Sequence, residues 1–378
     1  MSPYKLVKRF ALSLLVLSLS CLAANADIKI GVALPLTGIY ASLSKQIISG
    51  VEFAAEEINE EGGIKGEKII IEKSDDKCEP KNGPEIAKQL IEKKVIAVIG
   101  HLCDRPSIAA SPIYSENKIV QLSPTNQNAA FTENRPLESG GTYRLAARTS
   151  QQIDVLTSFL VTHEQKAKIA LLNNGSAYGK GLSDALTETL KEKGITPLLA
   201  TSFESGAERY SNLARRIVES GARLVFIGST HLDAARLIRD IDNLSGDITI
   251  IGGDGLVHVE FPKLVLENNP KRNTLSKIFT SFPVDPRSLE SAANAVNRFK
   301  KSDINPAGLV LRGYSAMKIL GKAMSSAEKL DFENLNKALN KQDFQTPLGT
   351  IRFDEKGDAN LSDYVVHQWR DNHIVALK

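Results

Sequence analysis

Short apolar runs alternate with amphipathic stretches along this chain of 378 residues, and this alternation restricts the possible folds more than any other feature. Runs such as Ile28–Leu34, Val95–Ile99 and Leu224–Ile227 are almost continuously apolar, as strands buried on both faces are. Between these runs, apolar residues recur at helical spacing, as in 47–58, and the glycine pair at 62–63 is expected to end that helix. Strands separated by helices predict an α/β fold with parallel sheets covered by helices on both faces.

The alternation continues over most of the chain and breaks at the glycine pair Gly140-Gly141. Further strands are expected at 68–72, 119–122, 169–172, 248–251 and 278–279, with short strands at 349–353 and 365–369. Further helices are expected at 84–94, 151–163, 182–193, 207–220, 232–241, 289–300 and 309–330. Two such blocks in a chain of this length predict two α/β lobes rather than one large sheet.

Residues 1–26 are expected to be a cleaved secretory signal peptide. Three basic residues precede an apolar run at Phe10–Leu19, and Ala24-Asn25-Ala26 supplies a small-residue cleavage pattern. The apolar run is too short to span a bilayer as a helix. Lipidation of Cys21 is disfavoured, because Ser18 stands where a lipobox needs a branched aliphatic residue.

The net charge of the protein changes once residues 1–26 are removed. Of the 47 basic residues in the chain, three lie in residues 1–26, which hold no acidic residue, so the remainder carries 44 of each sign. The exported protein is therefore nominally neutral. No basic excess argues for a nucleic acid or an anionic membrane as the partner.

Two cysteines, Cys78 and Cys103, remain after cleavage. In an oxidising compartment an even pair favours a disulfide, and closing a loop of about 25 residues stabilises a fold by roughly 3.5 kcal/mol in the chain-entropy model. The competing interpretation is a metal site built from these two cysteines and His101. That site lacks a fourth ligand at any standard zinc spacing.

Enzyme motifs are weak in this sequence. The segment GSAYGKG, 175–181, is one residue short of a phosphate loop and has no Ser or Thr after its lysine, so it is interpreted as a strand-to-helix turn. No G-x-G-x-x-G follows a strand, and no G-x-S-x-G is found. His101, His231 and His258 lie near expected strand ends but are interpreted as ordinary polar residues. We expect no catalytic residue, no metal and no cofactor.

Four motifs point more specifically to one family. They are AAEEINEEGGIKGEKIIIEKSDDKCEP (Ala54–Pro80), VIGHLC (Val98–Cys103), YGKG (Tyr178–Gly181) and FDEKGD (Phe353–Asp358). In combination they resemble the periplasmic leucine/isoleucine/valine-binding proteins of ABC importers. The similarity covers nearly the whole chain after residue 26, and the cysteine spacing looks like that family's disulfide.

The resemblance implies a type I periplasmic binding protein. Such a protein has two Rossmann-like lobes with parallel sheets, joined by three crossovers, which close on a ligand in the cleft between them. The lobes are expected at 27–148 with 277–343, and at 149–276 with 344–378. The implied function is to bind an amino acid or a related small solute in the periplasm, without enzymatic activity. The implied partners are a permease and an ATPase at the inner membrane, and the protein is expected to be a monomer.

The resemblance also assigns ligand-binding residues. Asp254, in the segment GGDG, is similar to the acid that meets the substrate ammonium, although the leucine binders commonly have Glu there. Tyr178 matches the family's cleft tyrosine. Ser123 and Thr125, in SPTNQ, match the loop whose backbone and hydroxyl receive the substrate. The alternative for Asp254 is a turn aspartate between glycines, and for Tyr178 a packing role.

Several positions depart from the family pattern. Gln127 stands where Thr is usual, and Thr230 and Leu43 replace aromatic side chains of the pocket. The largest departure is Asp104, which replaces a Ser whose hydroxyl donates to the substrate carboxylate. Two carboxylates about 4 Å apart repel by roughly 4 kcal/mol at an effective dielectric constant near 20, or about a thousandfold in affinity.

Three explanations of Asp104 are open from the sequence. It could cap its own helix and turn away from the cleft, since Asp is a preferred N-cap residue. Arg105 or another cation could neutralise it. The ligand could lack a carboxylate there and carry an amine or an amide instead. A ligand-sensing receptor domain is the other alternative to an importer component, and a hydrolase a remote third.

Overall fold

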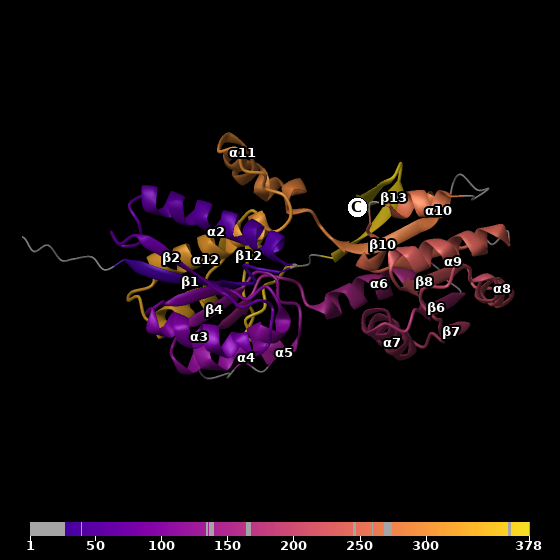
Figure 1. Ribbon diagram of the computed structural model, residues 1–378, viewed down its shortest axis with the longest axis horizontal. Coiled ribbons are helices and arrows are strands. Elements are labelled where there is room, and N and C mark those ends of the chain that lie inside the picture. Colours follow the sequence, from indigo (N-terminus) through magenta and orange to yellow (C-terminus); the bar gives the residue numbers. More distant parts are fainter. Residues whose placement is uncertain are drawn as a thin grey trace, which may run out of the picture.

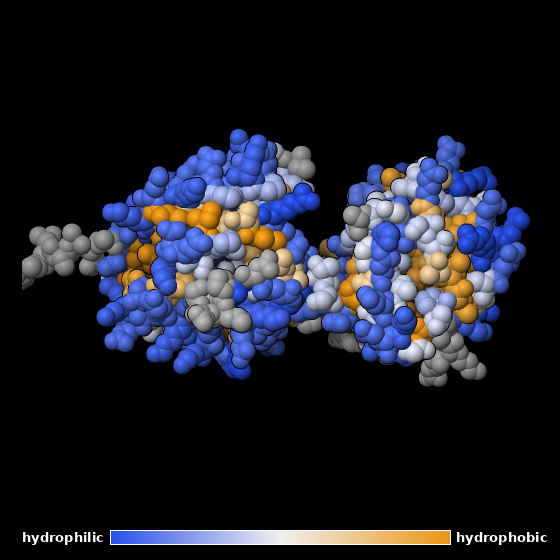
Figure 2. Space-filling view, turned by 90° about the horizontal axis from the view of Figure 1, so that it is seen from below, coloured by the Kyte–Doolittle hydropathy of each residue, from blue (hydrophilic) through white to orange (hydrophobic). Residues whose placement is uncertain are grey.

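The computed structural model describes residues 27–38, 40–133, 135, 140–163, 168–244, 247–258, 260–267, 274–361 and 364–377. The expected signal peptide lies outside the described residues. Two α/β lobes lie side by side along the longest axis of the molecule and are joined by a narrow neck (Figures 1 and 2). Within the described residues, no helix combines the length and the apolar character that crossing a membrane requires.

The first lobe contains a parallel sheet of five strands in the order β2-β1-β3-β4-β5. The strands are β1 (Ile28–Leu34), β2 (Ile69–Asp75), β3 (Ala97–Gly100), β4 (Val120–Ser123) and β5 (Thr142–Arg144). Helices α3 (Asn82–Glu92) and α4 (Asp104–Glu116) pack on one face of the sheet, and α2 (Ala41–Glu60), α12 (Val310–Ser326) and α13 (Phe332–Lys341) on the other. Helix α5 (Ala130–Glu133) follows β4. Apolar residues on both faces account for the near-continuous apolar runs.

The second lobe contains seven strands in the order β14-β13-β10-β9-β8-β6-β7. They are β6 (Ile169–Asn173), β7 (Leu199–Ser202), β8 (Leu224–Gly228), β9 (Thr249–Gly252), β10 (Ile278–Pro283), β13 (Tyr364–Arg370) and β14 (His373–Ala376). Helices α6 (Thr149–His163) and α7 (Ala177–Glu192) cover one face, and α8 (Ser211–Glu219), α9 (His231–Asn243) and α10 (Phe261–Leu266) the other. The described part of the chain also has four 3₁₀ helices, η1 (Asp254–Leu256), η2 (Leu275–Lys277), η3 (Pro286–Ser288) and η4 (Glu290–Ala292).

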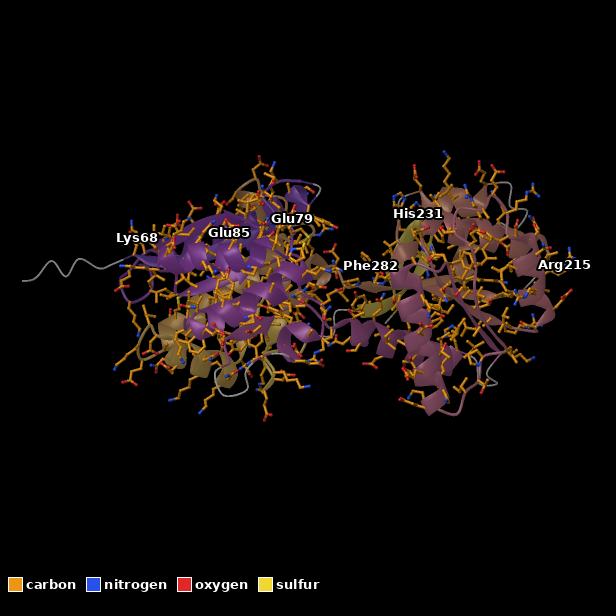
Figure 3. All side chains as sticks on the ribbon, turned by 60° about the horizontal axis from the view of Figure 1, so that its bottom comes forward. Lys68, Glu79, Glu85, Arg215, His231 and Phe282 are labelled. Carbon is orange, nitrogen blue, oxygen red and sulfur yellow. A yellow bond between two sulfur atoms is a disulfide. The ribbon has the colours of Figure 1, made fainter. Side chains whose placement is uncertain are left out.

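The chain passes between the lobes three times, as expected for a type I periplasmic binding protein. It leaves the first lobe after β5, returns after β10 to form α11 (Ala293–Lys301), and leaves again after the hairpin β11–β12 (Phe344–Thr346, Gly349–Ile351). Phe282, in β10, lies at the neck between the lobes (Figure 3).

The expected lobe boundaries need two corrections. Strand β10 was assigned by the boundary at residue 277 to the first lobe, but it pairs with β9 in the sheet of the second lobe. The boundary at 344 also fails, because residues such as Phe344, Ile351 and Phe353 belong to the apolar core of the first lobe. Both errors arise because the chain crosses between the lobes beyond these strands, at 284–288 and after Leu361.

Strand direction also differs from the expectation at the C-terminus. Strand β13 runs antiparallel to β10, and β14 runs antiparallel to β13. The sequence pattern did not predict β5, β7, β11 or β14, because β5 and β11 have only three residues each and β7 and β14 expose half or more of their side chains. Helices α5, α10 and α13 were not predicted either. The strands and helices that were expected are present, with ends that differ by a few residues.

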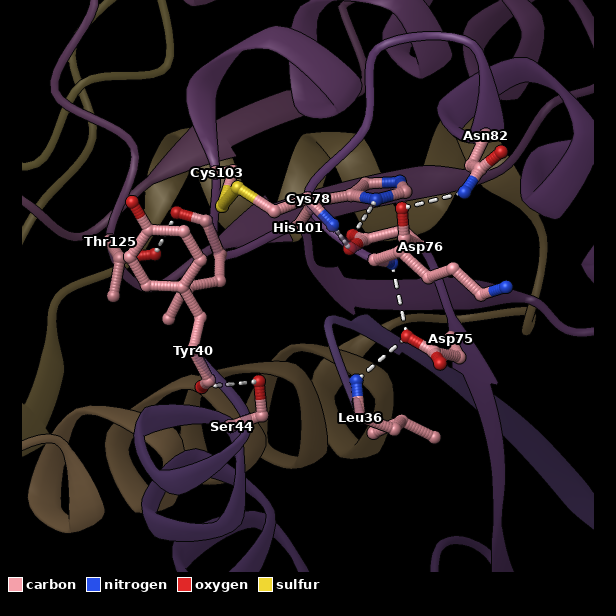
Figure 4. Close-up of a disulfide and its surroundings, with 12 residues drawn as sticks. Leu36, Tyr40, Ser44, Asp75, Asp76, Cys78, Asn82, His101, Cys103 and Thr125 are labelled. Carbon is pink, nitrogen blue, oxygen red and sulfur yellow. Dashed lines mark hydrogen bonds and ion pairs between the residues drawn. A yellow bond between two sulfur atoms is a disulfide. The ribbon is translucent and has the colours of Figure 1, made fainter. Parts of the chain in front are cut away.

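The predicted disulfide is confirmed. Cys78 and Cys103 are bonded, with their Cα atoms 5.5 Å apart (Figure 4). The two sulfur atoms are therefore bonded to each other and cannot act as thiolate metal ligands. The bond joins the segment after β2 to the residue that precedes α4.

We expect replacement of both cysteines by alanine to lower the free energy of unfolding by about 2–4 kcal/mol, because the 25-residue loop is no longer closed in the unfolded chain. Urea denaturation of the protein with and without the two substitutions measures this change. Two free thiols titrated in protein isolated without reductant would contradict the disulfide itself.

Candidate functional site

The candidate ligand-binding residues lie at the carboxyl ends of parallel strands in both lobes. In open α/β sheets ligands bind at this edge. Figure 3 shows that both edges are turned toward the gap: Glu79, after β2, and His231, after β8, lie nearer the gap, whereas Lys68, before β2, lies at the far end. The predicted site residues of the two lobes therefore face a common space.

The loop after β4 forms the first polar cluster, and its donors bond within the first lobe. The Ser123 hydroxyl accepts the backbone N–H groups of Thr125 and Asn126 at 3.4 and 3.0 Å, and it donates to the His101 carbonyl at 3.0 Å. The Thr125 hydroxyl donates to the Leu102 carbonyl at 2.9 Å. The loop predicted to receive a substrate is thus held by its own side chains.

Asp104 is the first residue of α4, after Cys103 at the N-cap position. Its Oδ1 accepts a hydrogen bond from the Gln127 backbone N–H at 3.1 Å, and no side-chain cap of α4 is formed. No ion pair within the described residues joins it to Arg105, which is exposed. Asp104 therefore neither caps its own helix nor relies on Arg105, and it instead bonds the substrate-receiving loop.

Gln127 has its side chain at the neck and not at Asp104. Its Nε2 donates to the Tyr364 hydroxyl at 3.2 Å, and its carbonyl accepts the Thr149 N–H at 3.3 Å. Thr149 begins α6 and Tyr364 begins β13, so Gln127 joins a loop of the first lobe to two elements of the second. The resemblance assigned Gln127 to the ligand, but its side chain contacts Tyr364 of β13, at the neck between the lobes.

Asp254 and Tyr178 form the second polar cluster, in the second lobe. The Tyr178 hydroxyl donates to Asp254 Oδ1, and Gln152 Nε2 approaches the same oxygen at 3.5 Å while donating to the Ser281 hydroxyl at 3.0 Å. These contacts bring the two predicted residues together. They also add Gln152, whose position within α6 gave no sequence signal of this role.

The glycines around these residues permit the close approach of neighbouring backbone. A Cβ at Gly255 would lie 2.3 Å from the Ser229 carbonyl oxygen, and one at Gly179 would lie 2.0 Å from the Gly228 carbonyl oxygen. The segment 175–181 is the predicted strand-to-helix turn, and the Ser176 hydroxyl caps α7 by accepting the Gly179 N–H at 3.1 Å. The glycines of this turn therefore allow neighbouring backbone to approach closely, and the turn is not a phosphate-binding loop.

The Tyr178 hydroxyl lies in a desolvated, acidic environment, although 40% of the residue is exposed. Burial of the hydroxyl, and then the charge of Asp254, raise the pKa of Tyr178 above its ordinary value. The phenol therefore stays protonated and donates to Asp254. Within the described residues, both hydrogen bonds to the Asp254 carboxylate involve Oδ1, so its second oxygen can accept another donor.

The remaining predicted pocket positions are exposed. Thr230 precedes α9, and its hydroxyl donates to Asp233 at 3.4 Å. Leu43, on α2, is 36% exposed. Their assignment to the ligand stays a prediction.

Another group of polar side chains, His231, His258 and Glu260, lies near the edge of the second lobe and was not predicted as a group. His231 and His258 stack with ring centroids 3.8 Å apart and planes inclined by 8°, and potential metal-ligating atoms of these two residues and Glu260 lie within 4.8 Å of one another. Glu260 N–H donates to His258 Nδ1 at 3.2 Å. Burial, and then His258, lower the pKa of His231.

His101 lies in a buried polar network beneath the disulfide. His101 Nδ1 lies 2.6 Å from Asp76 Oδ2, and both side chains are fully buried. Asp76 Oδ1 accepts the Cys78 N–H at 2.8 Å, as drawn in Figure 4. The network joins the segment before α4 to the residue that follows β2. It therefore fixes the position of His101, three residues before Asp104.

A buried ion pair joins the end of β5 to the segment that precedes the third crossover. Arg144 Nε donates to Asp358 Oδ1 at 2.5 Å, and Arg148 pairs with the other carboxylate oxygen. The Arg144 side chain is fully buried. Its remaining N–H groups donate to the Asn128 carbonyl at 2.7 Å and the Thr132 hydroxyl at 2.5 Å.

Comparison with known proteins finds one family over nearly the whole chain. The family described as periplasmic binding protein matches residues 27–373. An amino acid binding protein of Pseudomonas aeruginosa is 34% identical over 97% of both chains, and a Leu/Ile/Val-binding protein homolog of Brucella abortus is 32% identical over 92% of this chain and 91% of its own.

Solved structures share the fold at lower sequence identity. A substrate-binding protein of an ABC transporter from Desulfitobacterium hafniense, in complex with Leu, has a TM-score of 0.73 and 23% identity, with 93% of this chain and 100% of that chain covered. A leucine binding protein from Thermotoga maritima has a TM-score of 0.68 and 23% identity, with 93% and 98% covered. These two similarities concern the fold.

Proposed function

This chain belongs to the periplasmic binding protein family, among the type I proteins related to Leu/Ile/Val-binding proteins, and on this premise we propose that it is the solute-binding component of an ABC importer. It binds an amino acid or a related small solute between its lobes. The observation that carries the proposal is the pair of polar clusters, around Asp104 and around Asp254, at facing strand edges of two lobes joined by three crossovers.

Closure of the lobes gives these clusters their function. A small solute held by one cluster is enclosed when the other lobe approaches, and expulsion of water strengthens each charged contact. Three segments of the described chain lead across the neck, and bending of these segments would close the lobes. A binding cycle of this kind needs no catalytic group, and we propose that the protein is not an enzyme.

Its partners follow from the same role. A permease with its ATPase at the inner membrane would receive the solute from the closed form, and the protein would act as a periplasmic monomer. A sensor would present the same closed form to a membrane receptor. Genes for a permease and an ATPase beside this gene would favour the importer.

Native mass spectrometry of the purified protein tests solute binding directly. We expect a bound species in the mass range of an amino acid, lost when Asp254 is replaced by Asn and retained in the matched control Glu188→Gln. Glu188 lies exposed on α7, which also carries Tyr178. Absence of bound solute, together with no response to a panel of amino acids, amides and amines, would contradict the proposal.

A further inference from the structure

Both polar clusters present hydrogen-bond acceptors to the gap between the lobes. We propose that the solute carries N–H donors at both ends and has no free carboxylate, as in an amino-acid amide or a small diamine. This inference rests on the proposed function and names its substrate class. It follows from the hydrogen bonds that Ser123, Thr125, Gln127 and Tyr178 already donate within the protein.

In the first lobe, the main-chain N–H groups and hydroxyls of the loop that the sequence assigned to a substrate carboxylate already have acceptors. The N–H groups of Thr125 and Asn126 donate to Ser123 Oγ, and the hydroxyls of Ser123 and Thr125 donate to main-chain carbonyls. The Gln127 N–H donates to Asp104. An incoming carboxylate would have to displace one of these internal contacts.

Asp104 itself occupies the place of an anion. Its carboxylate lies in the first turn of α4, where free N–H groups and the helix dipole favour negative charge, and it also accepts the Gln127 N–H at 3.1 Å. The helix N-terminus and the loop after β4 thus hold an anion that belongs to the protein. Within the described residues nothing donates to the second oxygen, Oδ2, which can accept a donor from the solute.

The second lobe offers acceptors as well. Tyr178 directs its proton to Asp254, so its hydroxyl oxygen and the second oxygen of the Asp254 carboxylate both act as acceptors. A solute ammonium satisfies this cluster. No lysine or arginine forms an ion pair with Asp104 or Asp254 within the described residues.

Charge decides between an amide and an acid at the first cluster. An α-carboxylate about 4 Å from Asp104 would be repelled by roughly 4 kcal/mol at an effective dielectric constant near 20, which is about a thousandfold in the dissociation constant. A primary amide has no charge and donates two hydrogens, and a second ammonium is attracted. Leucine, isoleucine and valine should therefore bind more weakly than micromolar.

Calorimetry with leucine, leucinamide and putrescine tests the inference. We expect the unmodified protein to bind leucinamide or putrescine at least tenfold more tightly than leucine. Asp104→Asn, which keeps a side-chain oxygen for the Gln127 N–H, and Asp104→Ser should both tighten leucine binding and weaken putrescine binding by tenfold or more. Glu116→Gln, at the exposed other end of α4, should change neither.

The outcomes separate the inference from the proposed function. Submicromolar leucine binding by the unmodified protein, unimproved in both Asp104 variants, would overturn the inference and leave a solute-binding protein. No binding of any probe by folded protein, with no solute seen by mass spectrometry, would overturn both. Thermal unfolding of each variant shows that it is folded, and the asparagine variant retains the size of the native side chain.

Discussion

Replacement of Asp254 by alanine is expected to weaken solute binding by about 2–5 kcal/mol, because the positive group of the solute would lie in a closed cleft without its partner. Tyr178 also loses the acceptor of its hydroxyl hydrogen bond. The carboxylate is not part of an apolar core, so the fold should be retained. Calorimetry with the co-purified solute, or with leucinamide, measures the change.

Two further variants make this result specific. Tyr178→Phe removes the hydroxyl that orients the carboxylate and should weaken binding less than Asp254→Ala does. Glu188→Gln removes an exposed acid from α7 and should have no effect. An unchanged dissociation constant for Asp254→Ala, with an unchanged circular dichroism spectrum, would assign Asp254 to the 3₁₀ turn alone.

Most of the architecture could be predicted from the sequence, because strands buried on both faces give long apolar runs. Val95–Ile99 and Leu224–Ile227 predicted β3 and β8 to within a few residues. The lobe boundaries could not be predicted in this way. Strand β10 and the hairpin β11–β12 each lie close to a crossover, and local apolar patterns do not say which sheet a strand joins.

Part of the candidate site could also be predicted, because its residues follow the carboxyl ends of expected strands. Asp104 follows β3 in the sheet of the first lobe, and Tyr178 and Asp254 follow β6 and β9 in the sheet of the second lobe. Each residue therefore lies at the carboxyl end of a parallel strand, where ligands bind. Their partners could not be predicted. The donor to Asp104 is a main-chain N–H 23 residues away, and a backbone group leaves no mark in the sequence.

The same limit applies to the neck. Gln127 was assigned to the ligand because of its place in the loop, but its side-chain partner Tyr364 lies 237 residues further along the chain. Arg144 and Asp358 pair over 214 residues. Such contacts depend on how three crossovers converge, which is a property of the tertiary structure alone.

The buried pair at the neck leads to the second large expected effect. Asp358→Ala should lower the free energy of unfolding by about 3–5 kcal/mol, because the fully buried Arg144 would keep its charge without a counterion. The exposed pair of Arg352 with Asp343 is the matched control. Asp343→Ala should leave the urea midpoint almost unchanged, since solvent screens that pair. A midpoint equally unaffected by Asp358→Ala would contradict the structural importance of the buried pair.

The effect of Asp358 should depend on pH in a definite direction. Burial alone would raise the pKa of Asp358, but hydrogen bonds and charge from Arg144, Thr132 and Arg148 outweigh burial and lower it. A lowered pKa in the folded state stabilises the protein fully above the pKa of the unfolded chain, about 4, and this stabilisation is lost as the pH falls through the folded value. The difference in urea midpoint between the native protein and Asp358→Ala should therefore be constant from about pH 5 to 7 and decrease below about pH 4. A difference that instead grew on acidification would show that the protonated Asp358 stabilises the neck better than the carboxylate does.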